Sequence, residues 1–293
     1  MTKDLILQTR FGGEDQLERL MNMMGVSAPI MGPCAVRLTG IDQNEFESAW
    51  REKAAELQID ANWVDPELRL ANFRMFATDM DSTLLQLETL DEIAAMCGKG
   101  EEVAKITALA MQGVIKNYAE SLTARVAMLK GVDAEVIDRL LSAPILPNPG
   151  AADLIAAMHR ARIPTILISG GFSCVTNVIK QRFGFDHVLS NDLEIDEHGK
   201  LTGRVTGPKG SPIIDGIGKR AYITGYAAQY GCELSQVITM GDGSNDVPML
   251  EAAGMSVAWH AKPKVRPLAK QALDYSPLSG LLAFFADNPL MNR

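Results

Sequence analysis

The chain has 293 residues, of which 47% are hydrophobic and 22% charged, so it is neither disordered nor fibrous, and its length favours about two domains. A formal net charge of −8 gives no electrostatic reason to expect nucleic-acid or anionic-membrane binding, although a local pocket can still bind an anion. The four cysteines are scattered without a CxxC pair, and no apolar stretch reaches about 18 residues, so we expect a cytoplasmic protein without a zinc site, disulfides or a membrane span.

Residues 1–70 are predicted to form a small N-terminal α/β domain. Apolar periodicity predicts alternating strands and helices at residues 5–9, 14–24, 34–38 and 43–57. Residues 62–70 show little periodicity and are predicted to be a connector. This strand–helix–strand–helix order is that of half a ferredoxin-like or ACT-like domain.

The rest of the chain is predicted to be a core, residues 71–85 and 146–293, interrupted by a helical insert at residues 86–145. An apolar run at residues 73–78 predicts the first core strand. The insert shows helical periodicity without a good strand, beginning with one apolar face made of Leu90, Ile93, Ala94 and Cys97. Its end is marked by three prolines and a glycine within residues 144–150.

Strands and helices alternate after the insert. Strands are predicted at residues 165–168, 187–189, 237–240 and 256–259, the last of these being the final strand of the chain. Helices are predicted near residues 173–183 and 217–230, and a hairpin at 192–206. Alternating βα units predict a doubly wound parallel sheet, which binds ligands at the carboxyl ends of its strands.

Acidic residues follow two of the predicted core strands. Asp79 and Asp81 follow the first, and Asp242 and Asp246 follow a later one. If the sheet is parallel, all four lie along one edge, where clustered carboxylates repel each other unless a cation compensates. Hard oxygen donors with few histidines or thiols favour Mg²⁺, and a spare carboxylate beside it can be a nucleophile.

Two further features at this edge suit a phosphoryl substrate. Ser169-Gly170-Gly171 is predicted to be a strand-to-helix turn that offers a hydroxyl and backbone N–H groups to an anion. Lys219 lies near the start of a helix that returns its N-terminus to the same edge, so its charge can reach a phosphate. The phosphate-binding loops of nucleotide-binding proteins, GxxxxGK[ST] and GxGxxG, do not occur.

In order and spacing, these motifs resemble those of the haloacid dehalogenase superfamily of phosphatases. The four matching motifs are Asp79-Met80-Asp81-Ser82-Thr83, Ser169-Gly170-Gly171-Phe172, Lys219 and Gly241-Asp242-Gly243-Ser244-Asn245-Asp246. The resemblance covers residues 73 to about 275, and the stretch from Glu88 to Ile93 is similar to the branch that acts on phosphoserine. It implies a Rossmann-like core with a helical cap, here residues 86–145, over the site.

The resemblance also implies a reaction. Asp79 would attack phosphorus to form an aspartyl-phosphate, and Asp81 would protonate the leaving serine oxygen and then activate water. Mg²⁺ would be held by Asp79, the backbone carbonyl of Asp81, and Asp242, with Asp246 supporting the site. The phosphate and the rest of the small-molecule substrate, O-phosphoserine, would be bound by Ser169, Gly170, Lys219 and Asn245.

Four residues of the insert are expected to complete the substrate site. By resemblance, Glu88 would meet the substrate ammonium, Arg125 its carboxylate, and Met111 and Tyr118 would form an apolar wall. The family usually has a phenylalanine at the position of Tyr118. Two alternatives concern the charged pair: Glu88 could favour the N-terminus of the following helix through the helix dipole, and Arg125 could form a structural ion pair with Glu120 or Asp133.

The activity implied is hydrolysis of O-phosphoserine to serine and phosphate, the last step of serine biosynthesis. One alternative is a related phosphatase or phosphotransferase that uses another small phosphorylated amino or hydroxy acid. A substrate without an amino acid head would not need both Glu88 and Arg125. Another alternative is a non-catalytic amino-acid-sensing protein, which would not need to retain Asp79, Asp81 and Lys219 together.

Overall fold

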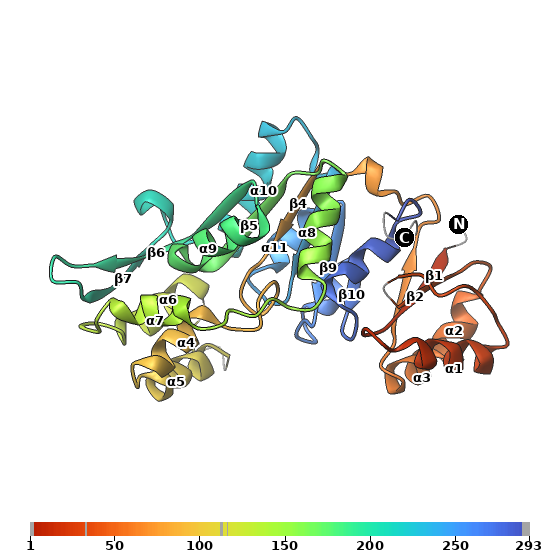
Figure 1. Cartoon of the computed structure of the whole chain (residues 1–293), viewed down its shortest axis with the longest axis horizontal. Helices are drawn as coiled ribbons and strands as arrows, with labels where there is room; N and C mark the ends of the chain where they lie inside the picture. The colour runs from red at the N-terminus through yellow and green to blue at the C-terminus, as the bar shows by residue number, and fades with distance from the viewer. Residues whose placement is uncertain (1–2, 33, 112–113, 116, 289–293) are drawn as a thin grey trace.

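The computed structural model describes residues 3–32, 34–111, 114–115 and 117–288, apart from the side chain of Met111. An N-terminal α/β unit lies at one end of the molecule, a sheet flanked by helices in the middle, and a helical insert with a hairpin at the other end (Figure 1). No helix among these residues is long and apolar enough to cross a membrane.

The N-terminal unit is a three-stranded antiparallel sheet in the order β2-β1-β3, built from β1 (Asp4–Gln8), β2 (Ala35–Leu38) and β3 (Asp60–Val64). The sheet packs against three helices, α1 (Glu14–Met24), α2 (Gln43–Ala49) and α3 (Arg51–Glu56). The prediction of one helix over 43–57 was wrong, because the segment breaks at Trp50, whose φ of −121° is not helical.

Strand β3 occupies the start of the segment that was predicted to be a connector. Its inward-facing positions include Asp60 and Asn62, so the usual apolar alternation of a strand is hidden. Both side chains bind the core. Asp60 accepts hydrogen bonds from the backbone of residues 274–276, and Asn62 exchanges two with Ala272 at 2.9 and 3.0 Å.

The central sheet has the strand order β10-β9-β8-β4-β5-β6-β7, and all neighbours are parallel except β6 and β7. This confirms the predicted α/β fold class with a mostly parallel sheet. The strands are β4 (Met75–Thr78), β5 (Thr165–Phe172), β6 (His187–Ile195), β7 (Leu201–Thr206), β8 (Val237–Gly241), β9 (Met255–Trp259) and β10 (Gln271–Leu273).

Helices flank this sheet and connect successive strands along the chain, as the βα alternation predicts (Figure 1). They are α8 (Ala151–Arg160), α9 (Ser173–Phe183), α10 (Gly216–Gln229) and α11 (Val247–Ala252). Short 3₁₀ turns complete the chain at Leu70–Asn72, Pro208–Gly210, Leu234–Gln236, Arg266–Leu268 and Leu278–Phe284. Strand β9 was wrongly predicted to be the last, since the three-residue β10 is too short to show a period.

The described part of the insert contains four helices between β4 and α8. They are α4 (Thr89–Met96), α5 (Gly100–Met111), α6 (Tyr118–Ala127) and α7 (Glu135–Ser142). The two chain segments that connect it to the core lie side by side, because Leu85 pairs with Pro147 and the Asn148 side chain donates to the carbonyl of Thr83 at 2.7 Å. The β6–β7 hairpin extends beside α6 (Figure 1).

Candidate active site

Three carboxylates meet where β4 and β8 end. These strands are neighbours in the sheet, and Asp79 and Asp242 are the residues directly after them. Asp246 follows at the start of α11. One oxygen from each of the three side chains lies within 4.8 Å of the others. The parallel sheet therefore brings Asp79 together with Asp242 and Asp246, although more than 160 residues of chain separate it from them.

A buried lysine lies among these carboxylates. The Nζ of Lys219 is 2.8 Å from Asp79 Oδ1 and 2.6 Å from Asp246 Oδ1, and the side chains of Lys219 and Asp246 are fully buried. Burial lowers the pKa of Lys219, but the two carboxylates raise it more, so the lysine stays charged. Helix α10 presents Lys219 from its first turns, after Asp215 caps the helix by accepting from Gly218 N at 2.8 Å.

This centre fits a divalent cation. Three carboxylates against one ammonium leave two formal negative charges in excess, and all the free donors are hard oxygens. Without a cation, burial and Asp246 raise the pKa of Asp79 well above its ordinary value, and the same two causes raise that of Asp242 to about 6. The cluster could therefore hold a divalent metal ion.

The two oxygens of Asp79 are not equivalent. Oδ1 accepts from Met80 N at 2.8 Å and faces Lys219, whereas Oδ2 accepts no hydrogen bond from the part of the chain that is described. The Asp242 carboxylate is oriented by Thr83, whose hydroxyl donates to it at 2.8 Å. Asp246 does more than begin α11: its Oδ2 accepts from the backbone N–H groups of Asp242 and Gly243 at 3.1 and 2.9 Å.

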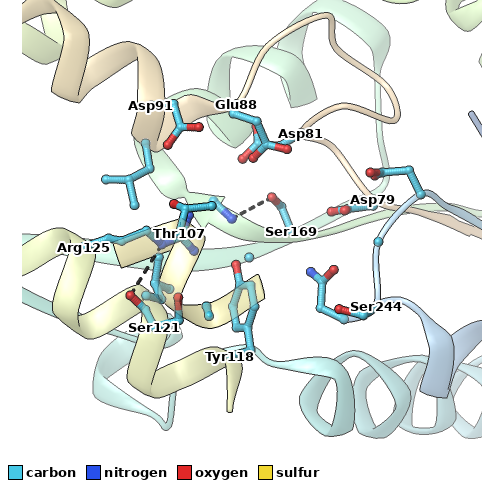
Figure 2. Close-up of a pocket in the computed structure, with 18 of the residues that line it drawn as sticks. Asp79, Asp81, Glu88, Asp91, Thr107, Tyr118, Ser121, Arg125, Ser169 and Ser244 are labelled. Atoms are coloured by element: carbon cyan, nitrogen blue, oxygen red, sulfur yellow. Dashed lines mark hydrogen bonds between the residues drawn. The ribbon is translucent and has the colours of Figure 1, made fainter. Parts of the chain in front are cut away.

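Asp81 stands apart from the metal-binding cluster, and its carboxyl is not among the three that converge. It lies beside Glu88 at the border of core and insert (Figure 2). Thr89 donates to Asp81 Oδ1 at 2.6 Å. Burial and the nearby charge of Glu88 raise the pKa of Asp81 to about 7, so this carboxyl exchanges protons near neutral pH.

Residues 169–171, which we name the anion cradle, differ from the predicted strand-to-helix turn. They continue β5, whose pairing with β6 shifts register between Ile168 and Phe172, and α9 begins only at Ser173. Within the cradle, Gly171 N donates to Ser169 Oγ at 2.8 Å, which leaves the Ser169 hydroxyl proton free. A Cβ at Gly170 would overlap with the Tyr118 hydroxyl, so this position needs glycine.

A fully buried asparagine holds the cradle in place. Asn191 of β6 donates to the carbonyl of Gly170 at 2.9 Å and accepts from Ile214 N at 2.8 Å. It therefore ties the cradle to the segment that leads into α10. We did not single out this residue from the sequence; an asparagine within an otherwise strand-like segment was the available signal.

A cavity of about 450 Å³ joins the core edge to the insert (Figure 2). Of the predicted site residues, it is lined by Asp79, Asp81, Glu88, Tyr118, Arg125, Ser169, Gly170, Asp242 and Asn245. Lys219 and Asp246 lie behind Asp79 and do not line it. Met111 ends α5, and its side chain lies outside the described residues. Polar lining that the sequence analysis missed comprises Asp91, Thr107, Asn117 and Ser121.

Arg125 faces this cavity from α6 without an ionic partner among the described residues. Its only hydrogen bond there is a long one, from Nε to the carbonyl of Ser121 at 3.4 Å. The alternative that it forms a structural ion pair was wrong, because Asp133 pairs with Lys200 at 2.8 Å and Glu120 interacts with Asn117. Its positive charge remains available to an anion in the cavity.

Glu88 faces the same cavity at the start of α4. It occupies the N-cap position, but its side chain makes no capping hydrogen bond. Instead, Ser82 Oγ donates to Glu88 Oε1 at 2.7 Å. The insert thus presents two carboxylates, Glu88 and Asp91, and the guanidinium of Arg125 to the cavity, opposite an acidic centre and an anion cradle from the core (Figure 2).

The comparisons with known proteins agree with this geometry. Residues 76–251 match the model of the haloacid dehalogenase-like hydrolase family. The phosphoserine phosphatase of Albidiferax ferrireducens is 44% identical over 220 residues, which cover 75% of this chain and 92% of that relative. The chain belongs to the haloacid dehalogenase-like hydrolase family, in the branch of the phosphoserine phosphatases, as the motifs predict.

Solved structures extend the similarity to the whole chain. The unliganded crystal structure of a probable phosphoserine phosphatase from Vibrio cholerae has a TM-score of 0.78 at 30% identity, covering 99% of this chain and 88% of that one. A substrate-bound phosphoserine phosphatase complex has a TM-score of 0.64 at 33% identity, covering 73% of this chain and 98% of that chain. The N-terminal unit therefore has a counterpart in the first structure.

Proposed function

We propose that this protein hydrolyses O-phospho-L-serine to L-serine and inorganic phosphate, with Mg²⁺ as its metal ion. The observation that carries the proposal is that one cavity joins an acidic centre and an anion cradle to two oppositely charged side chains, Glu88 and Arg125. Relatives named phosphoserine phosphatase, at 44% identity, support the choice of substrate. The product suits a role as the last step of serine biosynthesis, which we propose with it.

The substrate would lie between the core and the insert. Its carboxylate would pair with Arg125, since a guanidinium binds a carboxylate through two parallel hydrogen bonds. Its ammonium group would face Glu88. Its phosphoryl group would then lie toward Asp79, where the Ser169 hydroxyl and the backbone N–H of Gly170 are donors for the phosphoryl oxygens. Asn245, on the core side of the cavity, would complete the substrate site.

Asp79 would be the nucleophile. Its Oδ2, to which no described residue donates a hydrogen bond, would form a bond to phosphorus while the bond to the serine oxygen breaks. Protonated Asp81 would give its proton to that oxygen. Ionised Asp81 would then take a proton from the water that attacks the phosphorus of the aspartyl-phosphate, which releases phosphate and restores Asp79. A pKa of about 7 suits both roles of Asp81.

The metal ion would be held by Asp79 and Asp242, together with the backbone carbonyl of Asp81, and Asp246 would support the site. When bound, it would offset the negative charge of these carboxylates and of the phosphoryl oxygens. Lys219 would act through Asp79, which it contacts at 2.8 Å, by holding Oδ1 in place. Direct contact of Lys219 with the phosphate stays a prediction.

The division into domains is also a proposal. Residues 1–70 would form the N-terminal domain, residues 71–85 and 146–293 the catalytic core, and residues 86–145 the cap. In this division the cap supplies recognition of the amino acid head and excludes water during transfer. A cytoplasmic setting follows from the proposed metabolic role and stays a prediction.

The test is phosphate release from O-phospho-L-serine in Mg²⁺ and in EDTA, by the wild type and Asp79→Asn. We expect turnover only with Mg²⁺, and a loss of at least about 10³-fold in the variant because the nucleophile is gone. Asp153→Asn, on the exposed side of α8, is the matched control and should keep wild-type turnover.

O-phospho-L-threonine and p-nitrophenyl phosphate distinguish the substrate classes in the same assay. Preference for phosphoserine supports the roles given to Glu88 and Arg125. Turnover of the aryl phosphate without turnover of phosphoserine would contradict those roles and leave the chemistry of Asp79 intact. A folded, Mg²⁺-supplied protein that releases phosphate from none of the three would overturn the proposed function.

A further inference from the structure

Tyr118 is a residue of the insert that contacts the core. It opens α6, and Asn117 fixes this position because its side chain accepts from Glu120 N at 2.7 Å. From there the ring extends to β5, and the hydroxyl occupies the space that a side chain at Gly170 would need. Figure 2 shows the hydroxyl directed into the cavity on the side of Ser169.

The Tyr118 hydroxyl makes no hydrogen bond within the described ranges, although it faces a polar site. The nearby groups of the anion cradle are already engaged with each other or with Asn191: the carbonyl of Gly170 accepts from Asn191, and Gly171 N donates to Ser169. The hydroxyl is therefore a donor that no protein group near it uses.

The environment keeps this hydroxyl protonated. Burial raises the pKa of Tyr118, although the positive charges of Lys219 and Arg125 act in the opposite direction. A neutral hydroxyl beside an anion cradle can donate a hydrogen bond to a negative group without adding a negative charge of its own. An apolar wall would need the ring alone, which a phenylalanine supplies equally well.

We infer that the Tyr118 hydroxyl donates a hydrogen bond to a non-bridging oxygen of the phosphoryl group bound in the anion cradle. The inference rests on the proposed function and adds a catalytic residue to it. The Ser169 hydroxyl and the Gly170 N–H come from the core, whereas this donor comes from the insert. A bound phosphoryl group would thus accept hydrogen bonds from both the core and the insert, and the bond from Tyr118 would form only when the cradle holds that group.

The decisive variant is Tyr118→Phe, which removes one oxygen and keeps the ring. We expect the inhibition constant of inorganic phosphate to rise roughly 10- to 100-fold, which is the usual contribution of a hydrogen bond to a charged group. The inhibition constant of L-serine, which lacks the phosphoryl group, should stay within twofold of the wild type. The kcat/KM for O-phospho-L-serine should fall by a factor similar to that for phosphate.

Tyr222→Phe is the matched control, because Tyr222 of α10 is partly buried against the core and does not line the cavity. It should leave both inhibition constants unchanged. A phosphate constant that stays within twofold in Tyr118→Phe would overturn the inference. A rise confined to the inhibition constant of L-serine would also overturn the inference, because the hydroxyl would then bind the amino acid head of the substrate.

Calorimetric titration of phosphate into the Mg²⁺-supplied proteins separates this inference from the proposed function, because it needs no turnover. Weaker phosphate binding by Tyr118→Phe supports the inference even if the wild type does not hydrolyse O-phospho-L-serine, a result that would overturn the proposed substrate alone. Equal binding by the two proteins overturns the inference even if the wild type is fully active.

Discussion

The acidic centre, made of Asp79, Asp242, Asp246 and Lys219, and the insert wall, made of Tyr118 and Arg125, meet at the same cavity but are built in opposite ways. In the acidic centre, each charged group has a fixed protein partner: Lys219 binds Asp79 and Asp246, and Thr83 orients Asp242. In the insert wall, Arg125 has one long hydrogen bond to a backbone carbonyl. The Tyr118 hydroxyl has none among the described residues.

This difference separates chemistry from recognition. Groups that are already paired in the absence of substrate are preorganised, so they need little rearrangement when charge moves. Groups without a partner obtain one only from a ligand, so their interaction energy appears as affinity. We therefore expect changes in the acidic centre to affect folding stability and kcat, and changes in the insert wall to affect KM with little effect on stability.

Replacing Lys219 by methionine gives the largest expected effect on stability. Asp79 and Asp246 would be left as buried carboxylates without their cation, which typically costs about 3–5 kcal/mol. We expect this loss in the free energy of unfolding, measured by urea denaturation at pH 7 in EDTA. The loss should shrink as the pH is lowered, because the pKa of Asp79 is already raised and protonation removes its charge.

Lys200→Met is the control for the Lys219 variant. Lys200 forms an exposed ion pair with Asp133 at 2.8 Å, and such pairs contribute little, so its denaturation midpoint should hardly move. If Lys219→Met were as stable as Lys200→Met, the ion pairs of Lys219 with Asp79 and Asp246 would not hold the acidic centre together.

Replacing Arg125 by methionine tests the role of the insert wall in substrate affinity. We expect KM for O-phospho-L-serine to rise roughly 10- to 100-fold because a charge-assisted hydrogen-bonded pair is lost. The melting temperature and the inhibition constant of inorganic phosphate should stay near wild type. Arg139→Met, on the exposed face of α7, controls for loss of a positive charge on the insert. A marked loss of stability in Arg125→Met would place Arg125 with the structural residues.

Asn191→Leu links the two regions, because this residue supports the cradle without touching the cavity. It would leave the Gly170 carbonyl and Ile214 N without partners, at a cost of about 1–3 kcal/mol in unfolding free energy. As a positioning residue, it should also weaken phosphate inhibition about tenfold and leave L-serine inhibition unchanged. Asn191→Ser, which keeps a polar group, should recover part of both losses. Loss of stability with normal phosphate binding would mean that Asn191 has only a structural role.

The sequence predicted the acidic centre well because its residues directly follow buried strands. Strand order then brings Asp79 and Asp242 together without any further information. Long-range hydrogen bonds could not be predicted in this way. Asn191 and Asp60 act on segments 21 and more than 200 residues away, and β3 was missed because its inward side chains are polar.

The remaining differences between the predictions and the structure also arise from contacts between distant parts of the chain. The anion cradle was predicted to be a turn because two glycines follow a strand, but the pairing with β6 resumes at Phe172 and keeps the segment extended. The helices of the insert could be predicted from their periodicity, whereas the direction of each polar side chain depends on packing. For this reason Glu88 needed a family resemblance, whereas Arg125 also stood out as a guanidinium on an otherwise apolar helix face, and Asp91 and Thr107 were not found.

The smallest expected effect is a shift in pH dependence on replacing Thr89 by valine, which is nearly the same size. The Thr89 hydroxyl lowers the pKa of Asp81 by donating to its carboxylate at 2.6 Å. Removing it should therefore raise a pKa that already lies at about 7. In the proposed first step Asp81 must be protonated, so kcat/KM falls as the pH rises through this pKa.

The valine variant should then keep its kcat/KM to a pH higher by about one unit, the equivalent of about 1.4 kcal/mol for one hydrogen bond to a carboxylate. Thr123→Val, on the exposed side of α6, should leave the profile unchanged. A Thr89→Val profile that shifts to lower pH would contradict the assignment of this limb to Asp81. Asp81 lies between the two regions, because it belongs to the core while Glu88 and Thr89, at the start of the insert, raise and lower its pKa.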